Sequence, residues 1–144
     1  MNLRDACVEA AREVIAQEGI EHLSLRDVAR RLRVSHQAPY RHFPSREHLL
    51  AEVMRRCYAQ FAEHLQARAP QPDAHADLHA LGERYLDFAL SHPLDYRLMF
   101  STPWPQAAEQ AELTADANQA FDTLRRVMAR VHGVKAPTPA VDLD

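Results

Sequence analysis

Two short helical patterns follow one another with only a tight turn between them, and they constrain the fold of this 144-residue chain more than any other feature. The first covers about residues 25–32 and the second about residues 36–42. Ser24, with Asp27 three positions later, has the spacing of a helix N-cap, and Ser35 is the N-cap expected for the second helix. Helices this short are marginal by themselves, so longer neighbours must cover their apolar faces.

Longer helical patterns lie on both sides of this pair. Apolar residues recur at three- and four-residue spacing over 3–18 and again over about 46–68. Gly19 follows the first pattern, where a residue able to adopt positive φ is common, and Ser45 precedes the second as an N-cap. Helices whose second and third members are short and basic form a helix-turn-helix arrangement.

The second half of the sequence also has helical periodicity and no convincing strand. Pro70 and Pro72 interrupt the chain at about the point where the charge balance changes sign. Three further helices are predicted beyond them, over residues 74–91, 93–100 and 106–131. We therefore expect an all-α fold, with a module boundary at the prolines and a frayed tail over 133–144.

The net charge of −3 conceals a basic segment near the N-terminus. Residues 26–46 contain six arginines and a single acidic residue, Asp27, which gives this stretch a local charge of +5. A partner meets the local field and not the average one, so the overall acidity does not argue against a polyanionic partner. A solvated, arginine-rich helical face is the alternative interpretation.

Composition and cysteine usage exclude several other classes. Apolar residues make up 47% and charged residues 26%, the usual mixture of a globular protein. No uncharged apolar run is long enough to span a membrane, and the charged first twenty residues do not form a secretory signal. Cys7 and Cys57 lie within apolar helical patterns, so they indicate neither a disulfide framework nor a zinc site. We expect a soluble, cytoplasmic protein with no cofactor and no membrane partner.

Enzyme and metal signatures are weak. There is no G-x-S-x-G elbow and no glycine-rich phosphate loop, so we expect no enzymatic activity. His75 and His79 have the i, i+4 spacing of zinc ligands, with Asp73, Asp77 and Glu83 nearby. Without a cysteine or a fixed third ligand, we interpret this group as a solvated helix face and predict no metal.

The basic segment resembles a known family. Residues 24–50, SLRDVARRLRVSHQAPYRHFPSREHLL, are similar without a gap to the DNA-binding domain of the tetracycline-repressor (TetR) family of bacterial transcription regulators. The residues HPLDYRLMF at 92–100 resemble, more loosely, the regulatory helices of one subgroup. The resemblance implies a helix-turn-helix DNA-binding domain over 1–46, linked by helix 46–68 to a helical ligand-binding and dimerisation domain over 47–132.

The resemblance and the side-chain chemistry together assign a set of residues to double-stranded DNA. Phosphate contacts are expected from Ser24, Tyr40, His42 and Arg46, and base contacts from Arg26, His36, Gln37 and Arg41, with Ser35 at a helix start and Ala38 against a thymine methyl. Gln37 suits adenine and the arginines suit guanine. For His42 a cap on a neighbouring carbonyl is the alternative, and for Tyr40 ring packing.

Three departures from the family pattern bear on these expectations. Arg33 occupies a turn position where the family usually has glycine, so the turn either avoids positive φ or is strained. Ala38 and Pro39 replace a Thr-Leu pair, and Pro39 lacks an N–H, so the first turn of helix 36–42 is expected to be irregular. Family members usually carry two more C-terminal helices for dimerisation, whereas only 106–131 is available here, which puts the expected homodimer in doubt.

By resemblance, the second half encloses a pocket for a small apolar or amphipathic effector. The residues expected to line it are Phe61, Tyr85, Phe88, Tyr96, Met99, Phe100, Trp104 and Phe121, although such residues at helical spacing are more often core. The predicted function is a repressor that reads a pseudo-palindromic operator with helix 36–42. The alternatives are a small helical protein-interaction module and a truncated regulator that binds DNA without a ligand switch.

Overall fold

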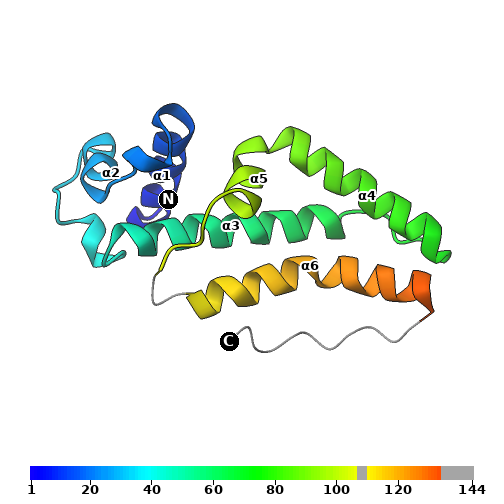
Figure 1. Cartoon of the computed structure of the whole chain (residues 1–144). Coiled ribbons are helices and arrows are strands. Elements are labelled where there is room, and N and C mark those ends of the chain that lie inside the picture. The colour runs from blue at the N-terminus through cyan, green and yellow to red at the C-terminus, as the bar shows by residue number, and fades with distance from the viewer. Residues whose placement is uncertain (107–109, 134–144) are drawn as a thin grey trace. The chain divides into compact units, whose positions relative to one another are not determined.

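The computed structural model describes residues 1–106 and 110–133, and all regular structure within these ranges is helical, as the sequence predicts (Figure 1). The described helices belong to two compact units. Unit 1 consists of Met1–Met54 with Pro103–Leu113, and unit 2 consists of Arg55–Thr102 and the chain from Thr114 onward. The tail predicted over 133–144 lies outside the described residues except for Gly133.

Unit 1 begins with the helix that the apolar periodicity predicts. Helix α1 spans Leu3–Glu18, and the Asn2 side chain caps it by accepting the N–H of Asp5 at 2.8 Å. One face of α1 is buried, through Cys7, Val8, Ala10, Ala11, Val14 and Ile15. Gly19 ends the helix at φ +96°, where a Cβ atom would lie 2.8 Å from the Glu21 side chain, so glycine is required there.

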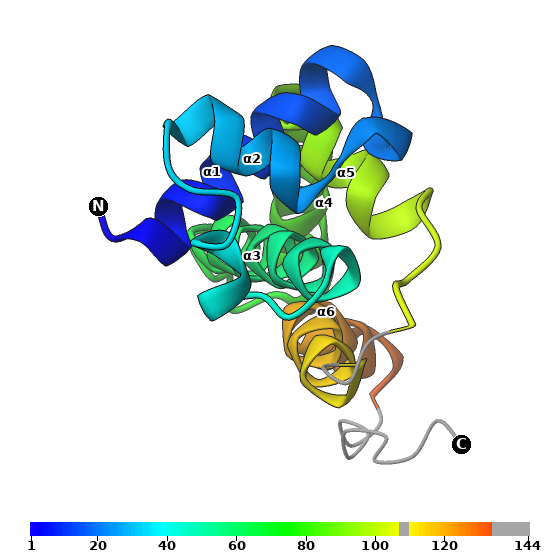
Figure 2. The same cartoon turned by 90° about the vertical axis from the view of Figure 1, so that its left-hand side faces the viewer.

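The next helix lies beside α1 and starts at the predicted cap (Figure 2). After the short 3-10 helix η1, Ile20–His22, helix α2 spans Leu25–Leu32. The Ser24 hydroxyl oxygen accepts the N–H of Asp27 at 3.0 Å, as the serine–aspartate spacing predicts. Leu25, Val28 and Ala29 are the buried residues of α2.

The turn after α2 places a non-glycine residue in the left-handed region. Arg33 has φ +57° and ψ +42°. Its N–H donates to the carbonyl of Arg30, and the N–H of Val34 donates to the carbonyl of Ala29, which is the Schellman pattern of a helix end. Of the two outcomes left open by the sequence, the strained turn is the one that forms.

Replacing Arg33 with glycine is therefore expected to stabilise the chain by about 1 kcal/mol, because the left-handed conformation costs an L-residue roughly that much. Chemical denaturation followed by circular dichroism measures the change. Arg33→Ala is the matched control, since it removes the same charge and keeps the Cβ atom. An equal gain in the alanine variant would contradict the backbone explanation.

The helix predicted over 36–42 is wrong in type. Residues 36–38 form turns, and the only helix in this stretch is the 3-10 helix η2, Pro39–Arg41, whose N-cap is Ala38 and not Ser35. The hydrogen bonds run from residue i+3 to residue i, starting with the Ala38 N–H to the Ser35 carbonyl at 3.1 Å. The physical reason is Pro39, which has no N–H to give the Ser35 carbonyl an α-helical partner.

Helix α3 starts where Ser45 predicts and contributes to both units. It spans Arg46–Gln66, two residues shorter than the sequence suggests, and the N–H of His48 donates to the Ser45 hydroxyl. Its buried residues include Leu49, Leu50, Val53, Met54, Cys57, Phe61 and Leu65, which form the predicted stripe.

In unit 2, the second half of α3 lies lengthwise with two other helices (Figure 1). Helix α4 spans Ala74–Ser91 and runs antiparallel to α3, the short α5 spans Pro93–Phe100, and α6 spans Gln110–His132. The start predicted for the last helix is too early, because Gln106 is not helical and 107–109 lie outside the described residues.

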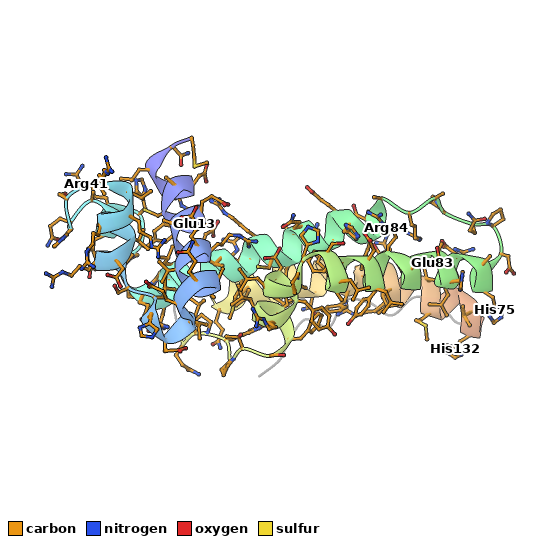
Figure 3. All side chains as sticks on the ribbon, turned by 90° about the horizontal axis from the view of Figure 1, so that it is seen from above. Glu13, Arg41, His75, Glu83, Arg84 and His132 are labelled. Atoms are coloured by element: carbon orange, nitrogen blue, oxygen red, sulfur yellow. The ribbon has the colours of Figure 1, made fainter. Side chains whose placement is uncertain are left out.

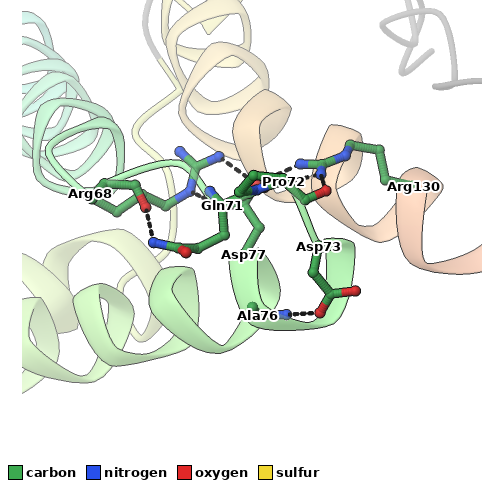
Figure 4. A network of polar contacts seen from close by, with 8 residues as sticks. Arg68, Gln71, Pro72, Asp73, Ala76, Asp77 and Arg130 are labelled. Carbon is green, nitrogen blue, oxygen red and sulfur yellow. Dashed lines mark hydrogen bonds and ion pairs between the residues drawn. The ribbon is translucent and has the colours of Figure 1, made fainter.

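A buried ion-pair network at one end of unit 2 is not predicted from the sequence (Figure 4). The Asp77 carboxylate is fully buried and accepts from Arg68 Nε at 2.8 Å and from Arg130 Nη1 at 2.6 Å. Arg130 also donates to the carbonyls of Gln71 and Pro72. The network therefore joins the end of α3, the α3–α4 connection, α4 and α6.

This network corrects part of the metal alternative. Asp77, which that alternative placed on an exposed face, is taken up by arginines, and His79 instead pairs with Glu83 at 3.0 Å. Among the described residues, no group of three or more His, Cys, Asp or Glu side chains is arranged to hold a metal ion. Within the same residues, no helix is long and apolar enough to cross a membrane.

Candidate nucleic-acid interface

The segment from His36 to His42 presents its polar side chains to solvent while two residues anchor it. Tyr40 is 48% exposed, and His36, Gln37, Arg41 and His42 are also exposed. Pro39 and Phe43 are buried and hold the segment against unit 1, with Phe43 only 1% exposed. Figure 3 shows Arg41 at the outer edge of unit 1, pointing away from the helices.

A second group of predicted DNA contacts lies at the start of α2. Arg26 is exposed, and Ser24 is half-buried with its hydroxyl oxygen occupied by the Asp27 N–H. The Ser24 hydroxyl proton remains able to donate to another oxygen. Ser35 is exposed and Ala38 is half-buried, so the turn before η2 also reaches the surface. No helix begins at Ser35, so the expected helix N-terminus at this position is absent.

Two of the arginines that raise the charge of this region are engaged with acidic side chains. Arg30 lies 3.3 Å from Asp27, and Arg31 lies within 4 Å of both Glu13 and Glu18. These pairs reduce the positive field on the face formed by α1 and α2. Most of the excess positive charge is therefore carried by Arg26, Arg33 and Arg41, with the exposed histidines beside the last of these.

Arg46 makes contacts that the sequence does not indicate. Its Nε donates to the Leu23 carbonyl at 2.8 Å and its Nη2 donates to the Ile20 carbonyl at 2.7 Å. In this structure, the guanidinium of Arg46 is thus directed at backbone of its own unit. Its predicted phosphate contact competes with these two hydrogen bonds.

The predicted effector-pocket residues mostly pack on one another. Phe61 is fully buried, and its ring lies 5.1–6.2 Å, between centroids, from the rings of Tyr85, Phe88, Phe100 and Phe121. Tyr96 adjoins this cluster and Met99 is buried, whereas Trp104 belongs to unit 1. The cluster has the contacts of a hydrophobic core.

Tyr85 is the one predicted pocket residue that also lines a described groove. This groove has a volume of about 440 Å³ and is lined mainly by α4, with Leu65 of α3 and Leu124 of α6. The Tyr85 hydroxyl lies 3.2 Å from that of Tyr96. Burial, together with this neighbour, raises the pKa of Tyr85 to about 12, so the phenol keeps its proton at neutral pH.

Comparison with known families agrees with this arrangement. Residues 8–53 match the family model described as bacterial regulatory proteins of the tetR family, and residues 78–143 match the one described as a tetracyclin repressor-like C-terminal domain. The two matches together cover most of the chain. No curated protein matches it at a significant level.

Solved structures are similar over most of this chain. The regulatory protein SCO4313 is 32% identical with a TM-score of 0.75, over 88% of this chain and 61% of its own. A protein from Rhodococcus sp. RHA1 is 27% identical with a TM-score of 0.75, over 96% and 73%. A tetR family transcription regulator from Shewanella sp. PV-4, at 23% identity and a TM-score of 0.72 over 96% and 76%, shares the fold. The chain thus spans about three fifths of the length of SCO4313.

Proposed function

We propose, since this chain belongs to the TetR family of bacterial regulatory proteins, that it is a DNA-binding transcription regulator and acts as a repressor. The observation that carries the proposal is the exposed polar segment from His36 to His42, held in place by buried Pro39 and Phe43. A segment this polar contributes little to a core, and its side-chain types suit base edges and phosphates. The family is one of regulators and not of enzymes.

The proposed contacts divide into two kinds. Tyr40, His42 and Ser24 donate to phosphate oxygens and fix the register of unit 1 on the duplex. Gln37, His36, Arg41 and Arg26 face base edges in the major groove, with Ala38 beside a thymine methyl and Ser35 at the entry to the turn. Their exposure in this structure supports this division.

Assembly and control follow from the same premise. One such segment reads only a few base pairs, so we propose a homodimer on a pseudo-palindromic operator in the cytoplasm, where bacterial DNA lies. A small apolar or amphipathic effector would bind unit 2 and release the DNA. The groove beside Tyr85 supports this part of the proposal, because its volume lies within the range of small-molecule sites.

The proposal predicts that the chain binds duplex DNA with a steep dependence on salt. If a dimer neutralises about six phosphates or more, its affinity should fall by about a thousandfold between roughly 50 and 200 mM salt. Fluorescence anisotropy with a labelled duplex, selected from a random-sequence pool on the wild-type chain, measures this. A small helical interaction protein would instead show weak binding without a selected sequence.

A pair of glutamine variants serves as the control for base recognition. Gln37→Ala is expected to reduce the preference for the selected duplex over a scrambled one by about 1–3 kcal/mol. Gln60→Ala removes an equally exposed glutamine from α3 in unit 2, and it should leave that preference unchanged. Equal effects of the two variants would contradict the assignment of Gln37 to a base.

A further inference from the structure

We infer, on the premise that the chain binds DNA as proposed, that Arg46 is a positioning residue that fixes the start of α2 relative to the start of α3, and not a phosphate-binding residue. The side chain acts through the backbone at Ile20 and Leu23, which leads into the first capped helix of the basic segment. The inference deepens the proposed function by separating the residues that hold the interface from those that touch DNA.

The geometry of the Arg46 side chain carries the inference. Arg46 is the first residue of α3, and two of its nitrogens donate to carbonyls that lie 23 and 26 positions earlier in the chain. Both hydrogen bonds are short, at 2.8 Å to Leu23 and 2.7 Å to Ile20. The Leu23 side chain is only 2% exposed, so its backbone is anchored in the core of unit 1. The rigid guanidinium fork therefore sets the distance between two helix starts.

The charge of Arg46 is also partly occupied within the protein. Its third nitrogen, Nη1, lies 3.7 Å from a carboxylate oxygen of Glu47, and the side chain is 35% exposed. Hydrogen bonds from a charged donor are about twice as strong as neutral ones. A phosphate would have to compete with two such hydrogen bonds and with a neighbouring negative charge. Arg41, which is exposed at the outer edge of unit 1, has no such competition in the described contacts.

The position of the two helix caps explains why this link matters for DNA binding. Ser24 follows Leu23 directly and caps α2, and Ser45 precedes Arg46 directly and caps α3. The two helix N-termini therefore lie about one arginine side chain apart. Phosphates along a strand have a fixed spacing, so contacts near both helix starts require this separation to be held constant.

The test compares Arg46→Lys and Arg46→Ala with Arg41→Ala on the selected duplex at several salt concentrations. A positioning role predicts that both Arg46 variants bind about tenfold more weakly, with the wild-type slope of log K against log salt. Lysine keeps the charge, yet it cannot make the two-pronged contact. Arg41→Ala should lower the magnitude of the slope by about 0.9 if it removes one phosphate contact.

Hydrogen exchange on the free chain gives a second readout that does not depend on DNA. Loss of the link should speed exchange of the Asp27 and Val28 amides, which bond to Ser24 at the start of α2. Wild-type exchange at these amides in Arg46→Lys would overturn the link. A slope lowered by about 0.9 in Arg46→Ala, with full binding by Arg46→Lys, would overturn the inference in favour of a phosphate contact.

These outcomes stay distinct from failure of the proposed function. If Arg46→Ala does not fold, Arg46→Lys carries both measurements. If the wild-type chain shows no selected duplex and no salt-dependent binding, the proposed function fails, and a role in DNA binding fails with it. The exchange measurement then still decides whether Arg46 holds the start of α2.

Discussion

Replacing Asp77 with asparagine is expected to destabilise the chain by about 3–5 kcal/mol at neutral pH, because it leaves buried guanidinium groups without their counter-charge. The Asp77 carboxylate is fully buried and receives hydrogen bonds from Arg68 and Arg130. The asparagine has nearly the same shape, so the change isolates charge from packing. Urea unfolding followed by circular dichroism measures the loss.

The effect should also depend on pH in a defined direction. The hydrogen bond from Arg68, with smaller contributions from the Gln71 N–H and Arg130, lowers the pKa of Asp77 below its ordinary value, against the opposing effect of burial. A carboxyl group with a lowered pKa in the folded state adds stability above its unfolded pKa of about 3.9. That stability is lost as the pH falls toward the lower folded-state value. The difference between wild type and Asp77→Asn should therefore shrink below about pH 4.

An exposed pair provides the matched control for Asp77. Asp122 lies 2.8 Å from Arg126, whose side chain is 70% exposed, on the same α6 that carries Arg130. Asp122→Asn should cost no more than about 0.5 kcal/mol. A similar cost for Asp77→Asn would show that water enters the network, and it would contradict the description of this carboxylate as buried.

Local signals in the sequence predict helix boundaries well because the interactions that set them span few residues. Ser24 caps α2 through an N–H three positions away, and Gly19 ends α1 through its own backbone conformation. Pro39 is the exception among local signals. Its missing N–H is readable from the sequence, yet the expected irregular first turn proved to be the loss of the α-helix over 36–42.

Long-range polar contacts could not be predicted in the same way. Arg46 bonds to Ile20 and Arg130 bonds to Asp77, and neither spacing follows from a helical period. A helical wheel places Asp77 and Arg46 only on a face of their own helices, and the partner depends on tertiary packing. The sequence therefore predicts which residues reach the surface of unit 1 better than which charged side chains remain available there.

Packing of the aromatic cluster has the same ambiguity at the level of sequence, since a core and an effector pocket use the same residue types. In this structure Phe61 is fully buried and contacts four other rings. A filled core and a preformed pocket differ in the cost of removing this ring. The cost is large where surrounding atoms must be left facing a cavity, and small where empty space already exists.

Phe61→Ala is expected to destabilise the chain by about 3–5 kcal/mol, and Phe61→Leu by about 1–2 kcal/mol, measured as shifts in urea unfolding. Leu90→Ala, at a position 81% exposed on α4, is the control and should stay within about 0.5 kcal/mol of wild type. The cavity in Phe61→Ala is apolar, so added benzene should bind there and raise the unfolding midpoint of that variant alone. A loss below about 1 kcal/mol, or an equal benzene effect on wild type, would instead indicate that space for an effector already exists beside Phe61.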